Sequence, residues 1–171
     1  MGSYDLGKDY ICNQIRNNYH ISASILDVGA CDGKWRELLP EYPNMDAVEA
    51  FGKNAAKLIY NGKYRNVFQA DIRDFQYEWY DLIIFGDVIE HLSVAQAQRV
   101  LNYAKPRCKD MIIAVPFMYE QEEIYGNPYE VHLQPDLTMD NFKERFPGFD
   151  VMLKPADFYC YYHKGANNGA I

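Results

Sequence analysis

Three residues with reactive side chains follow an apolar run in the second half of the chain. Asp87, Glu90 and His91 are spaced three and four positions apart, so on a helical turn Asp87 faces the other two. An imidazole titrates in the range of a general base, and carboxylates with imidazoles also bind divalent metals. His132, in a later polar stretch, can reach the same site. The spacing indicates acid–base chemistry or a metal site.

A second group of residues surrounds spaced glycines near the amino terminus. Residues 24–35 read SILDVGACDGKW, an apolar run suited to a buried parallel strand, then a turn and a helix start. Gly29 and Gly33 allow a ligand to approach the backbone closely. The dinucleotide fingerprint beginning at Gly29 needs glycines where Cys31 and Lys34 stand. The turn favours a nucleotide-like ligand other than NAD, with an ordinary strand-to-helix turn as the alternative.

Acidic residues stand at the ends of the next two predicted strands. Residues 46–50 form a strand with Glu49 at its end, sixteen positions after Gly33. A carboxylate there can accept hydrogen bonds from both hydroxyls of a ribose, so Glu49 is the predicted ribose ligand. The alternative is a solvated acid at a strand end. Residues 66–69 form a short third strand that leads to Asp71 and Ile72.

These strand ends together resemble one family. Residues 81–92, which carry the reactive residues, read Asp-Leu-Ile-Ile-Phe-Gly-Asp-Val-Ile-Glu-His-Leu. Over residues 24–163 the chain resembles the class I S-adenosylmethionine (SAM) dependent methyltransferases. Cys31 departs from the glycine pattern and can replace a glycine if its φ is negative. The acid-x-Gly-x-Gly-x-Gly loop of that family corresponds to Asp27, Gly29, Cys31 and Gly33.

The resemblance implies SAM as the cofactor and S-adenosylhomocysteine (SAH) as the product. It places the loop under the amino-acid and ribose parts of SAM, and Asp71 and Ile72 at the adenine amino group and ring. His91, His132 and Asp87 are the implied catalytic residues. The implied cofactor-binding residues are Asp27, Gly29, Ala30, Cys31, Gly33, Glu49, Ala50, Phe51, Asp71, Ile72 and Asp87.

Methyl transfer from a sulfonium is an in-line displacement, so catalysis depends mainly on positioning. A hydroxyl acceptor must lose its proton, and His91 or His132 is the expected base. The pattern acid-x-x-Glu-His with a later His also resembles metal-assisted O-methyltransferases of the ubiquinone pathway and of small-RNA 3′ ends. Asp87 stands where those enzymes have a Glu, the sequence does not fix the position of His132, and the same phrase resembles many metal-free members, so the metal-free base is preferred. A divalent ion on Asp87, Glu90, His91 and His132 is one alternative, and an ordinary helix start at Glu90 and His91 is another.

The elements that must position these residues alternate along the chain. Residues 5–18 have helical spacing of apolar residues, and the resemblance implies that this helix partly covers the cofactor. Only about eight residues separate Ile72 from the next strand, too few for a crossover helix. The expected fold is α/β, a doubly wound, mostly parallel seven-stranded sheet with helices on both faces and an antiparallel edge strand near the carboxyl terminus. Later strands are expected at 80–87, 110–116, 149–153 and 158–163, and helices at 34–39, 55–60, 93–104 and 138–145.

The polar, tyrosine-rich stretch 117–137 is too long for an ordinary connection. Long connections in compact domains are usually functional, although disorder is the alternative. We expect it to form the acceptor wall and to move on binding.

Composition limits the partners. With 171 residues, 49% of them hydrophobic, the chain fits one domain at 1–164 with a flexible tail at 165–171. The net charge of −7 disfavours nucleic acid and anionic lipid. Scattered cysteines at 12, 31, 108 and 160 and the lack of an apolar run near 20 residues predict a reduced, cytoplasmic protein.

The sequence therefore predicts a SAM-dependent methyltransferase that acts on a small polar acceptor, most simply by O-methylation. The alternative is a non-catalytic module that binds SAM or a nucleotide as a partner subunit. A nicotinamide oxidoreductase ranks third because of Cys31 and Lys34. The acceptor and the oligomeric state are left open.

Overall fold

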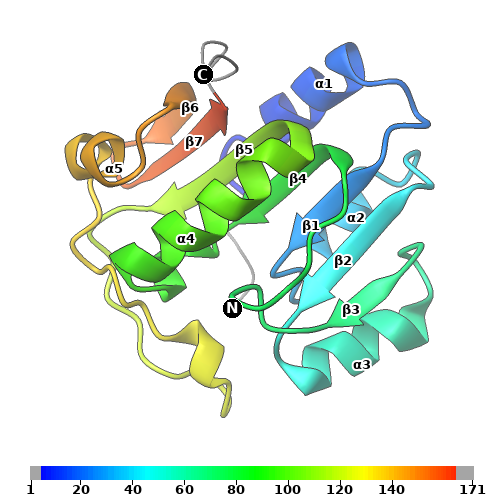
Figure 1. Ribbon diagram of the computed structural model, residues 1–171, viewed down its shortest axis with the longest axis horizontal. Coiled ribbons are helices and arrows are strands. Elements are labelled where there is room, and N and C mark those ends of the chain that lie inside the picture. Colours follow the sequence, from blue (N-terminus) through cyan, green and yellow to red (C-terminus); the bar gives the residue numbers. More distant parts are fainter. Residues whose placement is uncertain (1–4, 165–171) are drawn as a thin grey trace.

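A computed structural model describes residues 5–164, which are built around one seven-stranded sheet in the order β3-β2-β1-β4-β5-β7-β6 (Figure 1). Strands β1 to β5 pair in parallel, whereas β7 pairs antiparallel with both β5 and β6. The predicted fold class is confirmed. The strands are β1 (Ile25–Val28), β2 (Met45–Glu49), β3 (Val67–Gln69), β4 (Tyr80–Gly86), β5 (Cys108–Pro116), β6 (Phe149–Ala156) and β7 (Tyr159–Lys164).

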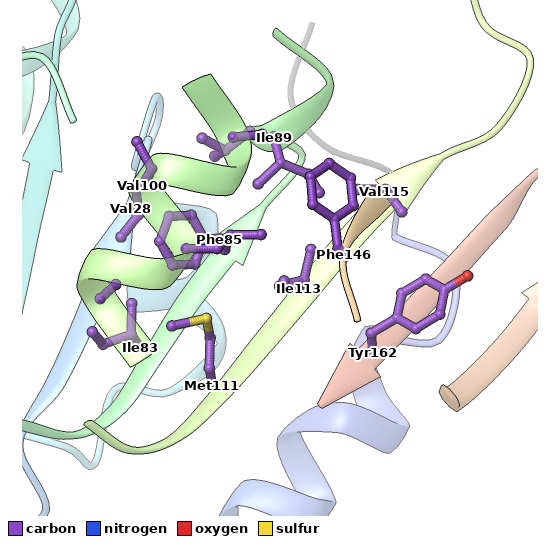
Figure 2. Packing of buried hydrophobic residues seen from close by; sticks show 14 of the residues in the cluster. Val28, Ile83, Phe85, Ile89, Val100, Met111, Ile113, Val115, Phe146 and Tyr162 are labelled. Atoms are coloured by element: carbon purple, nitrogen blue, oxygen red, sulfur yellow. The ribbon is translucent and has the colours of Figure 1, made fainter. Parts of the chain in front are cut away.

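Helices cover both faces of the sheet. On one face α4 and α5 close a core in which Val100 packs with Val28 and Phe85 from the strands (Figure 2). On the other face α1, α2 and α3 close a second core that contains Ile11 and Trp35. Every residue of β1 and β2 is buried, as expected for strands covered on both sides. The helices are α1 (Lys8–Asn18), α2 (Lys34–Leu38), α3 (Gly52–Asn61), α4 (Val94–Ala104) and α5 (Met139–Arg145).

The starts of α4 and α5 follow from their capping residues. Ser93 and Thr138 each form a capping box, in which the side chain accepts the N–H of the third helical residue and that residue's side chain returns a bond. Such boxes satisfy two backbone donors that a helix start leaves unpaired. The helices predicted from 93 and 138 are confirmed, with the capping residue itself outside the helix.

The connection between β3 and β4 contains no helix, as its length predicted. Aromatic rings occupy the space instead. The ring centroids of Phe68 and Phe75 lie 5.4 Å apart, those of Phe75 and Tyr77 5.0 Å, and those of Tyr77 and Tyr103 of α4 6.0 Å. The first pair is tilted at 50° and the other two are edge-to-face, and such contacts add to the stability gained from burying the rings.

The carboxyl-terminal hairpin forms the edge of the sheet. Strand β6 runs three residues further than the predicted 149–153, and its register with β7 shifts twice. Pro155 near the end of β6 is tolerated because an edge strand has one side without ladder bonds. The flexible tail predicted at 165–171 lies outside the described residues.

Candidate active site

A cavity of about 680 Å³ opens at the carboxyl ends of the parallel strands. The segments after β1, β2 and β4 line one side, and residues 119–133 line the other. The chain order of the strands reverses between β1 and β4, and open α/β sheets bind ligands beside such a point. Most predicted site residues line this cavity, namely Gly29, Ala30, Cys31, Glu49, Ala50, Asp71, Ile72, Asp87, His91 and His132.

The turn after β1 depends on left-handed backbone. Gly29 has φ 67°, and a Cβ there would lie 2.6 Å from Val88 Cγ2. Gly33 has φ 86° and precedes α2. The condition set for Cys31 to replace a glycine, a negative φ, is not met, because its φ is 48°. Cys31 therefore adopts a glycine-like conformation, which disfavours an L residue by roughly 1–2 kcal/mol.

Glu49 at the end of β2 is bonded to the glycine turn. Its side chain is 5% exposed and accepts the backbone N–H of Cys31 at Oε2 and that of Phe51 at Oε1, each at 2.8 Å. Burial raises the pKa of Glu49, and the two backbone bonds oppose that rise. Each carboxylate oxygen has a second lone pair. Glu49 thus holds the turn and retains the capacity to accept two ribose hydroxyls.

Asp71 is paired with Arg73 on the same turn. Arg73 Nε donates to the two carboxylate oxygens at 2.9 and 3.0 Å, and its Nη2 and backbone N–H donate as well. These bonds lower the pKa of Asp71. Ile72 beside it is 9% exposed and lines the cavity. Any further donor to Asp71 shares the carboxylate with this guanidinium, a pairing that the sequence did not predict.

Asp87 is turned toward β7 rather than along a helix. Its φ is 56°, and its Oδ1 accepts a hydrogen bond from the Tyr159 hydroxyl at 2.6 Å. The expected helical turn through Asp87 is wrong, because the segment that follows is a short 3-10 turn, η1 (Ile89–His91). Asp87 lines the cavity on a different backbone path from Glu90 and His91.

Glu90, His91 and His132 come together although 41 positions separate the two histidines. The histidine ring centroids lie 4.6 Å apart with the rings at 75°. His91 Nε2 lies 3.9 Å from Glu90 Oε1, too far for a hydrogen bond. The ligand-type atoms of the three side chains all lie within 4.8 Å of one another. The structure thus joins three of the four residues that the sequence offered for a base or a metal.

Burial sets the protonation of this group. Glu90 is 1% exposed, and within residues 5–164 neither of its carboxylate oxygens has a hydrogen-bond partner. Burial, with a smaller effect of the Asp87 charge, raises the pKa of Glu90 well above its usual value. Burial lowers the pKa of His91 to about 4 and also lowers that of His132. Both imidazoles are therefore neutral near pH 7.

The segment 117–137 is bonded to η1. The backbone N–H groups of Leu133 and Gln134 donate to the Glu90 carbonyl at 2.9 and 3.1 Å. The Gln134 side chain donates to the carbonyls of Ile89 at 2.8 Å and Leu92 at 3.0 Å. A short turn, η3 (Pro128–Glu130), lies at its tip. The expected movement of this wall stays a prediction, and any such movement starts from a hydrogen-bonded state.

Three predicted cofactor residues do not line the cavity. Asp27 is 1% exposed and accepts a hydrogen bond from the Tyr64 hydroxyl at 2.5 Å. Burial raises the pKa of Asp27 to about 7, against the lowering effect of Tyr64. Gly33 and Phe51 precede α2 and α3. In this structure the three residues support the backbone around the cavity.

Several lining residues were not selected from the sequence. Trp35 of α2, Gln121 and Glu130 all line the cavity. Gln121 Nε2 donates to the backbone carbonyl of Glu130 at 2.8 Å and to its carboxylate at 3.2 Å. Glu130 ends the short turn η3, two positions before His132, and no pattern in the sequence marked these three residues as lining a cavity.

Comparison with solved structures identifies the fold. A SAM-dependent methyltransferase from Clostridium acetobutylicum matches with a TM-score of 0.71 and 13% identity, over 96% of this chain and 92% of the other. The fold is that of the class I methyltransferases. The DhpI–SAH complex has the same fold, with a TM-score of 0.71 and 13% identity over 94% of this chain and 86% of the DhpI chain.

The methyltransferase fold also matches a larger protein. The sugar N-methyltransferase KedS8 from Streptoalloteichus has a TM-score of 0.56 and 18% identity over 66% of this chain. The match spans 49% of the length of KedS8. The sequence itself matches no protein-family model and no curated protein. Among the described residues, no helix has the length and apolar character needed to cross a bilayer.

Proposed function

We propose that this chain transfers a methyl group from SAM to a small polar acceptor by O-methylation. The observation that carries the proposal is the composition of the cavity. The glycine turn and Glu49 line the side at the strand ends, and His91 and His132 line it with the 119–133 wall. One cavity therefore brings a nucleotide-type surface next to groups that can activate a hydroxyl.

The residues on the strand-end side of the cavity have the chemical groups that SAM requires. Ala30 and Cys31 of the glycine turn would face its amino-acid part, and Glu49 would accept its ribose hydroxyls. Asp71 and Ile72 would receive the adenine, with Asp71 shared with Arg73. Lining residues Ala50 and Asp87 complete this set, and Phe51 holds the Glu49 carboxylate in place.

The acceptor hydroxyl loses its proton beside the two histidines. His132 Nδ1 lies 2.8 Å from the Tyr119 carbonyl oxygen, which only accepts, so Nδ1 carries the proton and Nε2 has a free lone pair. In the simplest version Nε2 takes the hydroxyl proton while the acceptor oxygen bonds to the methyl carbon and the carbon–sulfur bond breaks, leaving SAH. The cavity supplies alignment and limits water.

The charge around the acceptor side restricts its chemistry. Glu130 lines the cavity there, and the chain carries a net charge of −7. Negative charge close to the reacting group disfavours an acceptor with a phosphate or carboxylate nearby. A neutral hydroxyl compound, such as a sugar or a phenol, fits better than nucleic acid.

Turnover tests the proposal. Protein incubated with SAM and a panel of sugars, phenols and hydroxylated metabolites should form SAH and a methylated acceptor in equal amounts, read by mass spectrometry. His132→Ala should lower the rate on the order of 10²–10⁴-fold and leave SAH affinity unchanged. His20→Ala, at an exposed position outside the cavity, is the matched control. SAH binding with no turnover against the panel favours the non-catalytic SAM-binding module.

A further inference from the structure

We propose that the acceptor carries an ammonium group close to its reacting hydroxyl, and that the carboxylate of Glu130 binds this ammonium. Because this assigns the class of acceptor for the same cavity, it rests on the proposed function. The reacting hydroxyl itself is neutral, and the positive charge belongs to a separate group of the molecule. Amino alcohols, amino sugars and phenols with an aminoalkyl side chain are acceptors of this class.

The carboxylate of Glu130 is held in place by two neutral amides. Its Oε1 accepts a hydrogen bond from Asn127 Nδ2 and its Oε2 accepts one from Gln121 Nε2, each at 3.2 Å. Asn127 is buried, and its own Oδ1 accepts the backbone N–H of Tyr129 at 3.1 Å. These amides orient the carboxylate and leave its negative charge in place. Each carboxylate oxygen keeps a second lone pair for a further donor.

The cations that line the cavity already have other partners. The described lining residues include one lysine and one arginine, Lys34 and Arg73. Lys34 Nζ lies 2.7 Å from Asp5 Oδ1, and Arg73 is ion paired with Asp71. Among residues 5–164, no ion pair includes Glu130. A carboxylate that lines a cavity without a balancing cation attracts a positively charged ligand.

The charge of Glu130 acts on both sides of the cavity. Burial raises the pKa of Glu49, and the Glu130 charge adds to that rise. Burial lowers the pKa of His132, against the opposing effects of the Tyr119 bond and the Glu130 charge. Glu130 is thus near both the proposed ribose ligand and the proposed base. An ammonium bound to Glu130 is therefore a few bonds from a hydroxyl at His132 Nε2.

A buried carboxyl group without a partner lines the same cavity. Glu90 is 1% exposed, and within residues 5–164 neither of its side-chain oxygens has a hydrogen-bond partner. Burial, then the charge of Asp87 and that of Glu130, raises the pKa of Glu90, which places Glu130 within electrostatic range of it. A buried polar oxygen without a partner is costly. An ammonium has three donors, so it can bind Glu130 and also supply a hydrogen bond that Glu90 lacks.

Two tyrosine rings complete the proposed ammonium site. Tyr119 and Tyr129 line the cavity, and the Tyr119 ring centroid lies 5.3 Å from that of His132. Tyr129 directly precedes Glu130. Aromatic faces attract an ammonium that lies within about 6 Å of the ring centroid. The wall of the cavity therefore offers a cation both a carboxylate and aromatic surface.

Matched pairs of compounds test this assignment. Tyramine and 4-propylphenol have nearly the same shape but differ in charge, and glucosamine differs from glucose by an ammonium in place of one hydroxyl. Each compound is titrated into SAH-loaded full-length protein by calorimetry near pH 7, and each is also offered with SAM for turnover. In at least one pair, the cationic member should bind roughly tenfold more tightly and show a higher kcat/KM by a similar factor. About 1 M salt should reduce this preference.

Glu130→Gln should remove the preference for the cationic member and leave SAH affinity unchanged. Glu123→Gln is the matched control, because Glu123 is an exposed acid on the same segment that does not line the cavity. The control should keep the wild-type preference. Circular dichroism shows whether each variant is folded, and the comparison within each pair of compounds in wild type needs no variant.

Equal binding of the charged and neutral members by wild type overturns the assignment, as does a failure of every cationic member to bind. A preference that survives in Glu130→Gln overturns the role of Glu130, and a loss of SAH affinity in that variant would assign Glu130 to the cofactor instead. Turnover of neutral and cationic members at equal kcat/KM contradicts this inference alone. Preferential binding of the cationic members without any methyl transfer contradicts the proposed function alone.

Discussion

The backbone N–H of Cys31 donates to Glu49 Oε2 at 2.8 Å, which joins the glycine turn to the end of β2. Cys31 has left-handed backbone, so this bond helps to offset an unfavourable conformation. Because Phe51 binds the other carboxylate oxygen, one side chain organises two of the strand ends that line the cavity. The same carboxylate is the proposed ribose ligand. Ribose binding would therefore act on the side chain that also holds the glycine turn in place.

Glu49→Ala should weaken SAH binding by about 2–3 kcal/mol, because two charge-assisted hydrogen bonds to the ribose are lost. Glu49→Gln, which retains one acceptor oxygen, should fall between wild type and Glu49→Ala. Calorimetry with SAH measures both, and melting temperatures separate binding from loss of the turn. Unchanged SAH affinity in Glu49→Ala would remove the ribose assignment.

Gly29→Ala should abolish measurable SAH binding and destabilise the fold. Gly29 has φ 67°, which disfavours an L residue, and a Cβ there would lie 2.6 Å from Val88 Cγ2. Gly62→Ala is the matched control, because Gly62 has φ 61° and nothing within 4 Å of a Cβ. The control should lose roughly 1 kcal/mol of stability from backbone strain alone and bind SAH normally. Equal effects of the two substitutions in urea unfolding and calorimetry would contradict the close packing at Gly29.

Asp27→Asn should make stability less sensitive to pH. Burial raises the folded pKa of Asp27 to about 7, above its unfolded value near 3.9. Between these values the folded state holds the proton more tightly, so wild-type stability falls as pH rises from 4 to 7 and levels off above 7. An asparagine side chain resembles the protonated acid and still accepts from Tyr64.

The Asp27→Asn variant should therefore match wild type near pH 4 and exceed it near pH 8 by a few kcal/mol, at about 1.4 kcal/mol per pKa unit. Urea unfolding at both pH values provides the measurement. A difference between the two proteins that stays constant across this range would show that Asp27 titrates normally.

Gln134→Ala should destabilise the attachment of the acceptor wall. Gln134 is 2% exposed, and its amide binds the carbonyls of Ile89 and Leu92. Leaving buried carbonyls unpaired costs roughly 1–3 kcal/mol. Gln98→Ala removes an exposed amide that binds the Arg145 carbonyl and should cost far less. Hydrogen exchange should be faster in 117–137 for Gln134→Ala only, and an unchanged exchange pattern would mean that the wall is held by its backbone bonds.

The sequence predicted the sheet because buried parallel strands leave continuous apolar runs with polar residues at their ends. It predicted the positions of Glu49 and Asp71 at those ends for the same reason. It missed the pairing of Asp71 with Arg73 and the left-handed Cys31, since neither spacing nor residue type reports side-chain direction or φ. Both features depend on the folded backbone and are seen only in the structure.

The grouping of Glu90, His91 and His132 was predicted only in part. The expected helical turn would have placed Asp87 beside Glu90 and His91. Asp87 instead has left-handed backbone, and a 3-10 turn follows it. His132 reaches the group because Leu133 and Gln134 bind the Glu90 carbonyl. Such long-range backbone bonds leave no local pattern in a sequence.

The central claim is that the cavity binds SAM, and titration of the purified protein with SAH and with NAD tests it most directly. Calorimetry should show one SAH per chain, with binding weakened by Glu49→Ala, and no measurable heat from NAD. Binding of NAD in preference to SAH, or SAH binding that Glu49→Ala and Gly29→Ala both leave intact, would contradict the account.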